Sequence, residues 1–112
     1  MGELAYFPSR VPLQVGFARA ELTQILNLYG RMVAAGHWRD YAMSMTTDAA
    51  QFAAFRRTAE RPEIRIEKRP ALRMRQGQWA LIGEAGQILK RGHELPGVLA
   101  PIERRLLKLI SG

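Results

Sequence analysis

Apolar side chains recur at helical spacing near the start of the chain. They lie three or four positions apart and would form one stripe on a helix: Leu22, Ile25, Leu26, Tyr29, Met32 and Val33. Gly36 follows the stripe, and glycine often ends a helix because it adopts the left-handed conformation without steric cost. The spacing therefore predicts an amphipathic helix over residues 17–36, around which the rest of the chain is expected to pack.

Strict alternation of polar and apolar residues predicts a strand over Glu63–Lys68. Its two isoleucines, Ile64 and Ile66, are expected to face the core. The residues on the other side of the strand are expected to face water: Glu63, Arg65 and Glu67. Proline cannot donate to a strand ladder, so Pro70 is expected to end this strand.

Two further apolar runs, Trp79–Gly83 and Gln87–Arg91, predict a hairpin. The three-residue connection between them ends in Gly86, where a left-handed residue is expected. Upstream, residues 41–45 form either a short strand or an irregular continuation. Residues 51–57 are ambiguous, because their alanines suit a helix, whereas a hairpin with the strand that follows is the more economical arrangement. We interpret them as a strand.

A second stripe of apolar residues predicts a C-terminal helix over residues 95–111. Its members are Leu95, Val98, Leu99, Ile102, Leu106, Leu109 and Ile110. Pro96 and Pro101 suit the first turn of a helix. The segment is therefore either one helix or a short turn followed by a helix that begins at Pro101.

The first sixteen residues are expected to form an extended arm, because prolines and a glycine interrupt their apolar positions. Its docking residues would be Leu4, Tyr6 and Phe7. A chain of 112 residues is long enough for one domain with one core. The predicted fold is α+β in a single domain over residues 1–112. It has one antiparallel sheet of four to five strands over residues 40–91, an N-terminal amphipathic helix and a C-terminal helix.

The chain contains no cysteine, which excludes disulfides, thiolate metal sites and cysteine nucleophiles. The N-terminus does not resemble a signal peptide, and no apolar run approaches the ~20 residues that cross a bilayer. Glycine-rich phosphate loops and closely spaced histidine pairs are also missing from the sequence. We therefore expect a cytoplasmic protein with no metal, no cofactor and no membrane partner.

The net charge of +7 indicates an anionic partner, either DNA or RNA or an acidic protein. Eight basic residues and three acidic residues lie between Arg56 and Arg75. Adjacent strands would gather them into an Arg-rich sheet face that follows a phosphate backbone, with Trp79 or Phe52 stacking on bases. The candidate nucleic-acid-binding residues are Arg56, Arg57, Arg65, Lys68, Arg73, Arg75, Lys90 and Arg91. The structural alternative is a solvated face on which Arg and Glu pair across strands.

A second candidate site follows the first helix, in the sequence His37-Trp38-Arg39-Asp40-Tyr41. Its polar members and a distant histidine form a possible small site: His37, Arg39, Asp40 and His93. Two histidines and an arginine can cleave RNA without a metal, one histidine acting as base and the other as acid. The structural alternative is a corner in which Trp38 and Tyr41 anchor the helix end to the sheet.

These observations favour a small basic non-enzymatic domain that binds nucleic acid or acts in regulation. One alternative is a protein-interaction module or homodimeric scaffold, since a one-sided sheet of this size often covers its open face by dimerising. The other alternative is a small metal-free ribonuclease-like enzyme.

Three stretches of the sequence resemble a family of short, mainly alphaproteobacterial proteins that is catalogued as a domain of unknown function. They are LNLYGRMVAAGHWRDY (residues 26–41), FRRTAERPEIRIEK (residues 55–68) and ILKRGHEL (residues 88–95). The resemblance covers residues 17–95 and implies no established activity. It implies that Arg39, Asp40, Tyr41, Arg56, Arg57, Lys68, Lys90, Arg91, Gly92 and His93 lie in shared motifs. Members of this family have more β-branched residues near residues 52–55, which favours a strand there.

Overall fold

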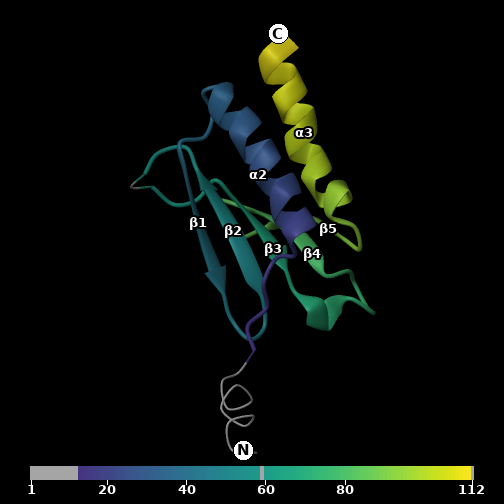
Figure 1. Ribbon diagram of the computed structural model, residues 1–112. Helices are drawn as coiled ribbons and strands as arrows, with labels where there is room; N and C mark the ends of the chain where they lie inside the picture. The colour runs from purple at the N-terminus through teal and green to yellow at the C-terminus, as the bar shows by residue number, and fades with distance from the viewer. Residues whose placement is uncertain (1–12, 59, 112) are drawn as a thin grey trace, which may run out of the picture.

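The chain folds into one five-stranded antiparallel sheet and two α-helices (Figure 1). The structure is a computed structural model that describes residues 13–58 and 60–111. Its elements are α2 (Arg19–Ala34), β1 (Asp40–Met45), β2 (Ala50–Phe55), β3 (Ile64–Lys68), the 3-10 helix η1 (Pro70–Leu72), β4 (Trp79–Gly83), β5 (Ile88–Gly92) and α3 (Leu95–Ser111). The predicted α+β class is confirmed. The predicted docking residues of the arm, Leu4, Tyr6 and Phe7, lie outside the described residues.

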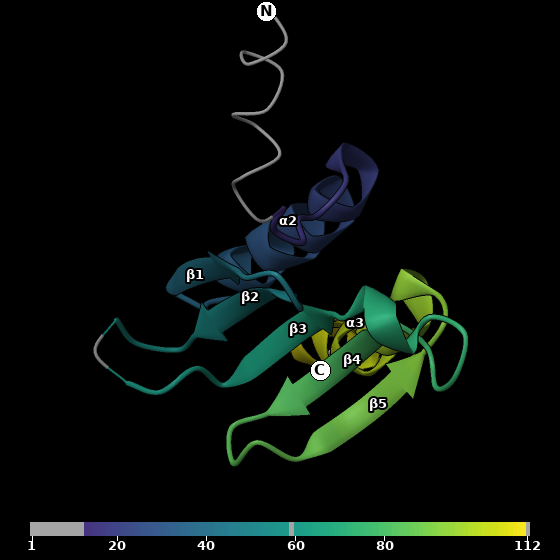
Figure 2. The ribbon, with the colours of Figure 1, turned by 90° about the horizontal axis from the view of Figure 1, so that it is seen from below.

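The strands follow one another across the sheet in chain order, as Figure 2 shows. Phe52, Ile66 and Leu81 occupy matched positions on β2, β3 and β4, and all three are buried. They belong to the same core cluster as Ile25 of α2 and Val98 of α3. Both helices therefore cover this side of the sheet, which we call the helix face.

The opposite side of the sheet, which we call the open face, is defined by two rows of matched residues. The first row is Ala42, Ala53, Arg65, Ile82 and Ile88, and the second is Ser44, Gln51, Glu67, Ala80 and Arg91. Matched residues of antiparallel strands point to the same side, and neighbours in sequence point to opposite sides.

The buried side of α2 is rotated relative to the predicted stripe. Leu28, which was not in that stripe, is buried, whereas Leu26 is 37% exposed and Val33 is 41% exposed. At about 100° per residue, Leu28 lies on the side of α2 that faces α3. On that side Arg31 forms an ion pair with Glu103 of α3 at 3.0 Å. The prediction for Leu26 and Val33 was wrong because α2 packs against a helix as well as the sheet.

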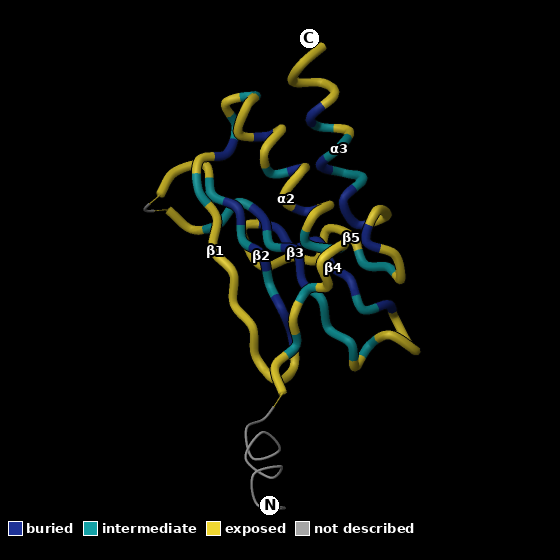
Figure 3. The backbone as a smooth tube through the Cα atoms, in the orientation of Figure 1, coloured by how far each residue is buried: buried dark blue, intermediate teal, exposed yellow. Residues whose placement is uncertain are grey.

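The C-terminal helix is one continuous element, with Pro101 inside it. Five of its seven predicted core residues are buried, from Leu95 to Leu106. The last two, Leu109 and Ile110, are exposed because the end of α3 extends past the sheet (Figures 1 and 3). The predicted core position of these two residues is therefore wrong.

The predicted strand boundaries agree closely with the structure. The ambiguous segment around residues 51–57 is strand β2, and residues 40–45 form β1. Gly36 and Gly86 both have positive φ, at 78° and 87°, as the helix end and the hairpin loop require. Within the described part of the chain, no helix combines the length and the apolarity that a membrane crossing needs.

Candidate functional site

The fold divides the predicted Arg-rich face into paired and unpaired residues. Arg56 lies 3.4 Å from Glu63 and 3.5 Å from Glu84, and Arg57 lies 3.9 Å from Glu60. Lys68 donates to Glu21 at 2.8 Å, which ties β3 to the start of α2. Lys68 and Arg56 therefore connect parts of the fold, whereas the Arg57–Glu60 pair lies within one loop between two exposed side chains.

The other five predicted residues have no ion pair within residues 13–58 and 60–111: Arg65, Arg73, Arg75, Lys90 and Arg91. Four of them are arginines. Register places Arg65 and Arg91 on the open face. Arg73 and Arg75 are exposed in the turn after η1. We call these four residues the arginine surface. Lys90 is also exposed, but register places it on the helix-face side of the edge strand β5.

The turn after η1 is fastened to the end of β5, which brings its arginines beside the open face. The Nη1 atom of Arg91 donates to the Gly77 carbonyl at 3.3 Å. The Gly77 backbone also packs directly against Gly92, since a Cβ built on Gly77 would lie 2.3 Å from the Gly92 carbonyl carbon. Arg75 is two residues from Gly77 in the sequence, so the turn that carries Arg73 and Arg75 is anchored at the end of β5 that carries Arg91.

Register places two acidic residues on the open face, Asp40 at the start of β1 and Glu67 in β3, and Glu67 is already neutralised. Its carboxylate accepts hydrogen bonds from Gln51 at 2.9 Å and from Arg69 at 3.2 and 3.3 Å. Burial favours a higher pKa for Glu67, but these hydrogen bonds and the charges of Arg69 and Arg91 outweigh it, so the pKa is lowered. Glu67 is only 5% exposed, and its predicted position facing water was wrong because Arg69 and Gln51 cover it.

The two aromatic residues predicted to stack on bases cannot do so. Phe52 and Trp79 are 0% and 2% exposed, and both point to the helix face. Trp79 stacks instead on Phe17 with ring centroids 6.1 Å apart. Neither residue therefore offers an exposed aromatic ring on the open face.

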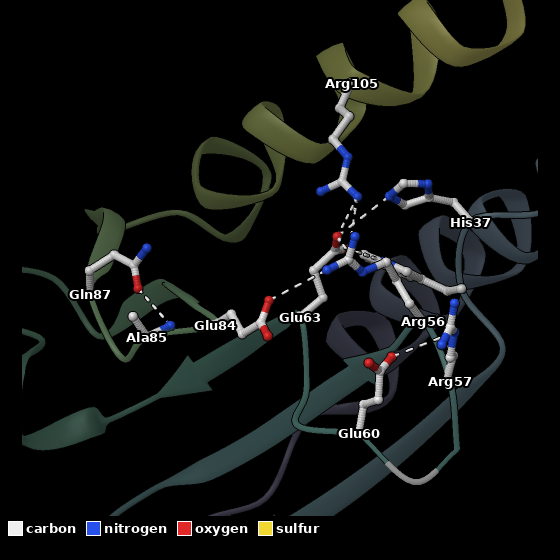
Figure 4. Close-up of polar contacts among 10 residues, drawn as sticks. His37, Arg56, Arg57, Glu60, Glu63, Glu84, Ala85, Gln87 and Arg105 are labelled. Carbon is white, nitrogen blue, oxygen red and sulfur yellow. Dashed lines mark hydrogen bonds and ion pairs between the residues drawn. The ribbon is translucent and has the colours of Figure 1, made fainter.

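A second cluster surrounds Glu63, just before β3 (Figure 4). Its carboxylate accepts a hydrogen bond from the indole nitrogen of Trp38 at 2.6 Å. The Nη2 atom of Arg105 lies 2.8 Å from both carboxylate oxygens. His37 Nε2 and Arg56 Nε lie 3.5 and 3.4 Å from the same oxygen. One carboxylate therefore joins the end of α2, the end of β2 and the middle of α3.

Sequence reasoning missed this role of Glu63 and did not select Arg105. Glu63 was predicted to face water, which was wrong because its side chain is enclosed by these donors. The available signal was Trp38, since a buried indole N–H requires an acceptor. Nothing in the spacing identified which acceptor it would meet, because Trp38 and Glu63 are 25 positions apart.

The predicted small site is not assembled as one constellation. Asp40 accepts a hydrogen bond from the backbone N–H of Tyr41 at 2.8 Å, and Arg39 is exposed. His37 reaches Glu63 at the start of β3, whereas His93 follows β5, whose end is aligned through β4 with the end of β3. The length of β3 separates the two histidines, roughly 15 Å at the usual rise of a strand. A pair of histidines sharing one phosphate is not formed. No group of residues that could hold a metal ion occurs in the described ranges.

The Glu63 cluster is expected to make stability fall as pH is lowered. Burial and the Arg105 charge lower the pKa of His37. Burial favours a higher pKa for Glu63, but hydrogen bonds from Trp38 and Arg105 outweigh it and lower the pKa. For both groups the unfolded chain binds protons more readily, so stability is lost below about pH 6.5 for His37 and below about pH 4.3 for Glu63.

Urea unfolding between pH 7 and pH 5 tests the histidine contribution. His37→Gln should flatten the fall in the free energy of unfolding over this range. His93→Gln removes the other histidine at an exposed position and is the matched control. Equal flattening in both variants would contradict a specific role for His37.

The comparisons place the chain in a family but leave its activity undefined. The family model described as Protein of unknown function (DUF2794) matches residues 15–99. No curated protein and no solved structure matches the chain. The matched region runs from the residues before α2 into the first turns of α3, and it includes the sheet, the arginine surface and Glu63. The chain therefore belongs to the family Protein of unknown function (DUF2794).

Proposed function

We propose that this protein is a non-enzymatic domain that binds nucleic acid through the phosphate backbone. The observation that supports the proposal is that some of the predicted basic residues form ion pairs and others do not. Three of the eight candidates take part in ion pairs, whereas the four of the arginine surface lie on the open face and in the adjacent turn without such partners among the described residues. Planar guanidinium groups bind phosphate oxygens with two parallel hydrogen bonds.

The surroundings of the arginine surface suit an extended polyanion. Neither α2 nor α3 covers the open face, and its β1 and β2 positions carry small or polar side chains: Ala42, Ser44, Gln51 and Ala53. Glu67 adds little repulsion because Arg69 already neutralises it. Contacts of this kind position a protein on nucleic acid without reading its sequence.

Catalysis is disfavoured by the same geometry. The two histidines lie at opposite ends of β3, and His37 faces a carboxylate and two arginines rather than an open cleft. Proton transfer to and from one phosphate requires both groups within hydrogen-bond reach of it. His93 follows Gly92 next to the arginine surface, but His37 lies at the other end of β3, so a second histidine does not accompany it there.

An electrophoretic shift titrated with salt tests the proposal on duplex DNA, single-stranded DNA and RNA of random sequence. Four phosphate contacts would give a slope of log K against log salt of about −3.6 on duplex DNA. The triple variant Arg65→Gln, Arg73→Gln, Arg75→Gln should reduce the magnitude of that slope by about 2.7. Arg91 is left unchanged because it also supports the turn through Gly77.

The matched control is the triple variant Arg19→Gln, Arg61→Gln, Arg104→Gln. It removes the same net charge from exposed positions away from the open face. An equal loss in the two triple variants would show that only total charge matters and would contradict a defined surface. Failure of the unaltered protein to bind any of the three probes at about 50 mM salt would refute the proposed function.

A further inference from the structure

The two edges of the sheet are built differently. β5 carries Lys90 and Arg91, and its pairing with β4 has a register shift at Leu81 and Ile82. Charged residues and irregular pairing on an edge strand prevent it from pairing with another chain. β1 has the sequence DYAMSM, with no lysine, arginine or proline, and it pairs with β2 in one unbroken register. The one charged residue of β1 is Asp40 at its start, so the rest of β1 lacks the charges and the irregular pairing that protect β5.

The backbone groups of alternate residues in β1 point away from the sheet. Thr46 N–H donates to Ala49 at the hairpin end, and Glu63 N–H donates to Ala54 on the other side of β2. Because the two ladders of β2 alternate, Ala42 and Ser44 are the β1 residues that bond β2. The N–H and C=O groups of residues 41, 43 and 45 are therefore directed outward along an edge that no other described strand pairs with, and just past its end Val15 N–H donates to the Thr46 carbonyl at 2.7 Å. We call this the free edge.

Apolar side chains run beside this free edge on the helix face. Tyr41, Met43 and Met45 are 40–44% exposed, and Tyr29 of α2 packs edge-on against Tyr41 at 5.1 Å. Leu26 and Val33 lie on the same side of α2 as Tyr29 and are also exposed. We call these five exposed residues the β1 strip: Leu26, Val33, Tyr41, Met43 and Met45. Figure 3 shows β1 exposed along its length.

We propose that β1 pairs with β1 of a second copy, which joins two five-stranded sheets into one ten-stranded sheet. The pair is antiparallel, with Met43 on the two-fold axis and Tyr41 opposite Met45 of the other copy. This register keeps the helix faces of both copies on the same side, which a shift by one residue would not. It also uses every outward group of residues 41, 43 and 45, giving six backbone hydrogen bonds.

The charges at the ends of β1 complement this register. Arg39 lies just before β1 and Asp48 lies in the turn after it, and both are exposed. Neither has an ion-pair partner within the described part of the chain. With Met43 on the axis, Arg39 of each copy is brought next to Asp48 of the other. The two-fold axis therefore creates two equivalent ion pairs.

Self-complementarity favours a second copy over an unrelated partner. The β1 strip is apolar on both sides of the axis, so α2 of each copy would cover the exposed Leu26 and Val33 of the other. Interfaces of permanent dimers are apolar in this way, and a two-fold interface buries the same patch twice. The pairing is independent of nucleic-acid binding, since it uses the edge of the sheet and leaves the arginine surface free.

Sedimentation equilibrium at about micromolar and higher concentrations tests the pairing. We expect a particle of twice the 12.7 kDa chain mass. Met43→Lys places two lysines at the axis and should weaken dimerisation at least tenfold, because like charges directly opposite on paired strands repel. Met74→Lys adds the same charge in the exposed turn after η1 and should leave the dimer intact. Thermal unfolding of each variant shows whether its monomer is folded.

The absence of cysteine allows a second and independent measurement. In the proposed register the two Met43 Cα atoms lie about 5.5 Å apart, which a disulfide can span. Met43→Cys should therefore cross-link under mild oxidation much faster than Met74→Cys. A monomeric unaltered protein, a dimer that Met43→Lys does not weaken, or equal cross-linking of the two cysteine variants would each overturn the proposal.

Discussion

Replacing Trp38 with alanine is expected to lower the free energy of unfolding by about 3–5 kcal/mol. Trp38 is 1% exposed and belongs to the core cluster, where its ring stacks against Tyr29 at 6.0 Å. The substitution leaves a large cavity and removes the indole donor that bonds Glu63 at 2.6 Å. Thermal unfolding followed by circular dichroism measures the loss directly.

The variant Trp38→Phe separates the two contributions of the indole. It keeps most of the buried ring but removes the donor to Glu63, so the expected loss is about 1–3 kcal/mol. Arg105 continues to hold the carboxylate, which limits the cost. A melting temperature of Trp38→Ala equal to that of the unaltered protein would contradict the buried position of this residue.

The elements of the fold could be predicted because each depends on local periodicity. Alternation identified β3, and the positive φ of Gly86 follows from the short connection that it ends. The alanines of β2 alone suit a helix. We predicted a strand there because a hairpin with the strand that follows is the simplest arrangement. The alanines of this segment favour a helix, but hydrogen-bonded pairing with β1 on one side and β3 on the other makes it a strand.

The exposed side of α2 could not be predicted from its own sequence. The stripe from Leu22 to Val33 has helical spacing, yet the burial of Leu28 depends on where α3 lies. The position of α3 is set by contacts with β4 and β5 and with α2. Whether a helix residue is buried can be predicted only when the elements that pack against its side of the helix are known.

The sequence predicted where the charged residues of the candidate sites lie, but not which residues they form ion pairs with. Alternation correctly placed Arg65 on the face opposite the isoleucines of β3. It did not indicate that Glu67 would be enclosed by Arg69 and Gln51, or that Glu63 would meet Arg105 across 42 positions. Such pairs depend on strand register and helix docking, which are long-range properties.

The arginines of this chain fall into two groups with different surroundings. Around Glu63, arginines from β2 and α3 compensate a carboxylate at the junction of three elements. Breaking such a pair exposes an uncompensated buried charge, so these arginines stabilise the fold. The four residues of the arginine surface lack such partners among the residues that the structure describes, whereas Arg69 pairs with Glu67. The net charge of +7 alone did not separate these groups.

Gly77→Ala is expected to be the most damaging single-methyl change in the turn that presents the arginine surface. A Cβ at this position would lie 2.3 and 2.4 Å from the carbonyl carbon and oxygen of Gly92 and 2.8 Å from the backbone nitrogen of His93. These are backbone atoms and cannot rotate away. The φ of Gly77 is also +101°, which side chains rarely adopt. Together the clash and the backbone strain should cost about 3 kcal/mol or more.

Gly86→Ala is the matched control because it adds the cost of a side chain at positive φ without the steric clash. Gly86 has a similar φ of +87°, but no atom lies within 4 Å of its added Cβ. Its substitution should cost only about 1–2 kcal/mol. Urea unfolding of the two variants compares them, and equal losses would show that the turn does not pack against β5 as described. On the proposed function, a folded Gly77→Ala variant should also bind nucleic acid more weakly, because the turn that carries Arg73 and Arg75 would no longer be anchored to Arg91 through Gly77. Gly86→Ala, in the hairpin loop at the other end of β5, should bind as the unaltered protein does.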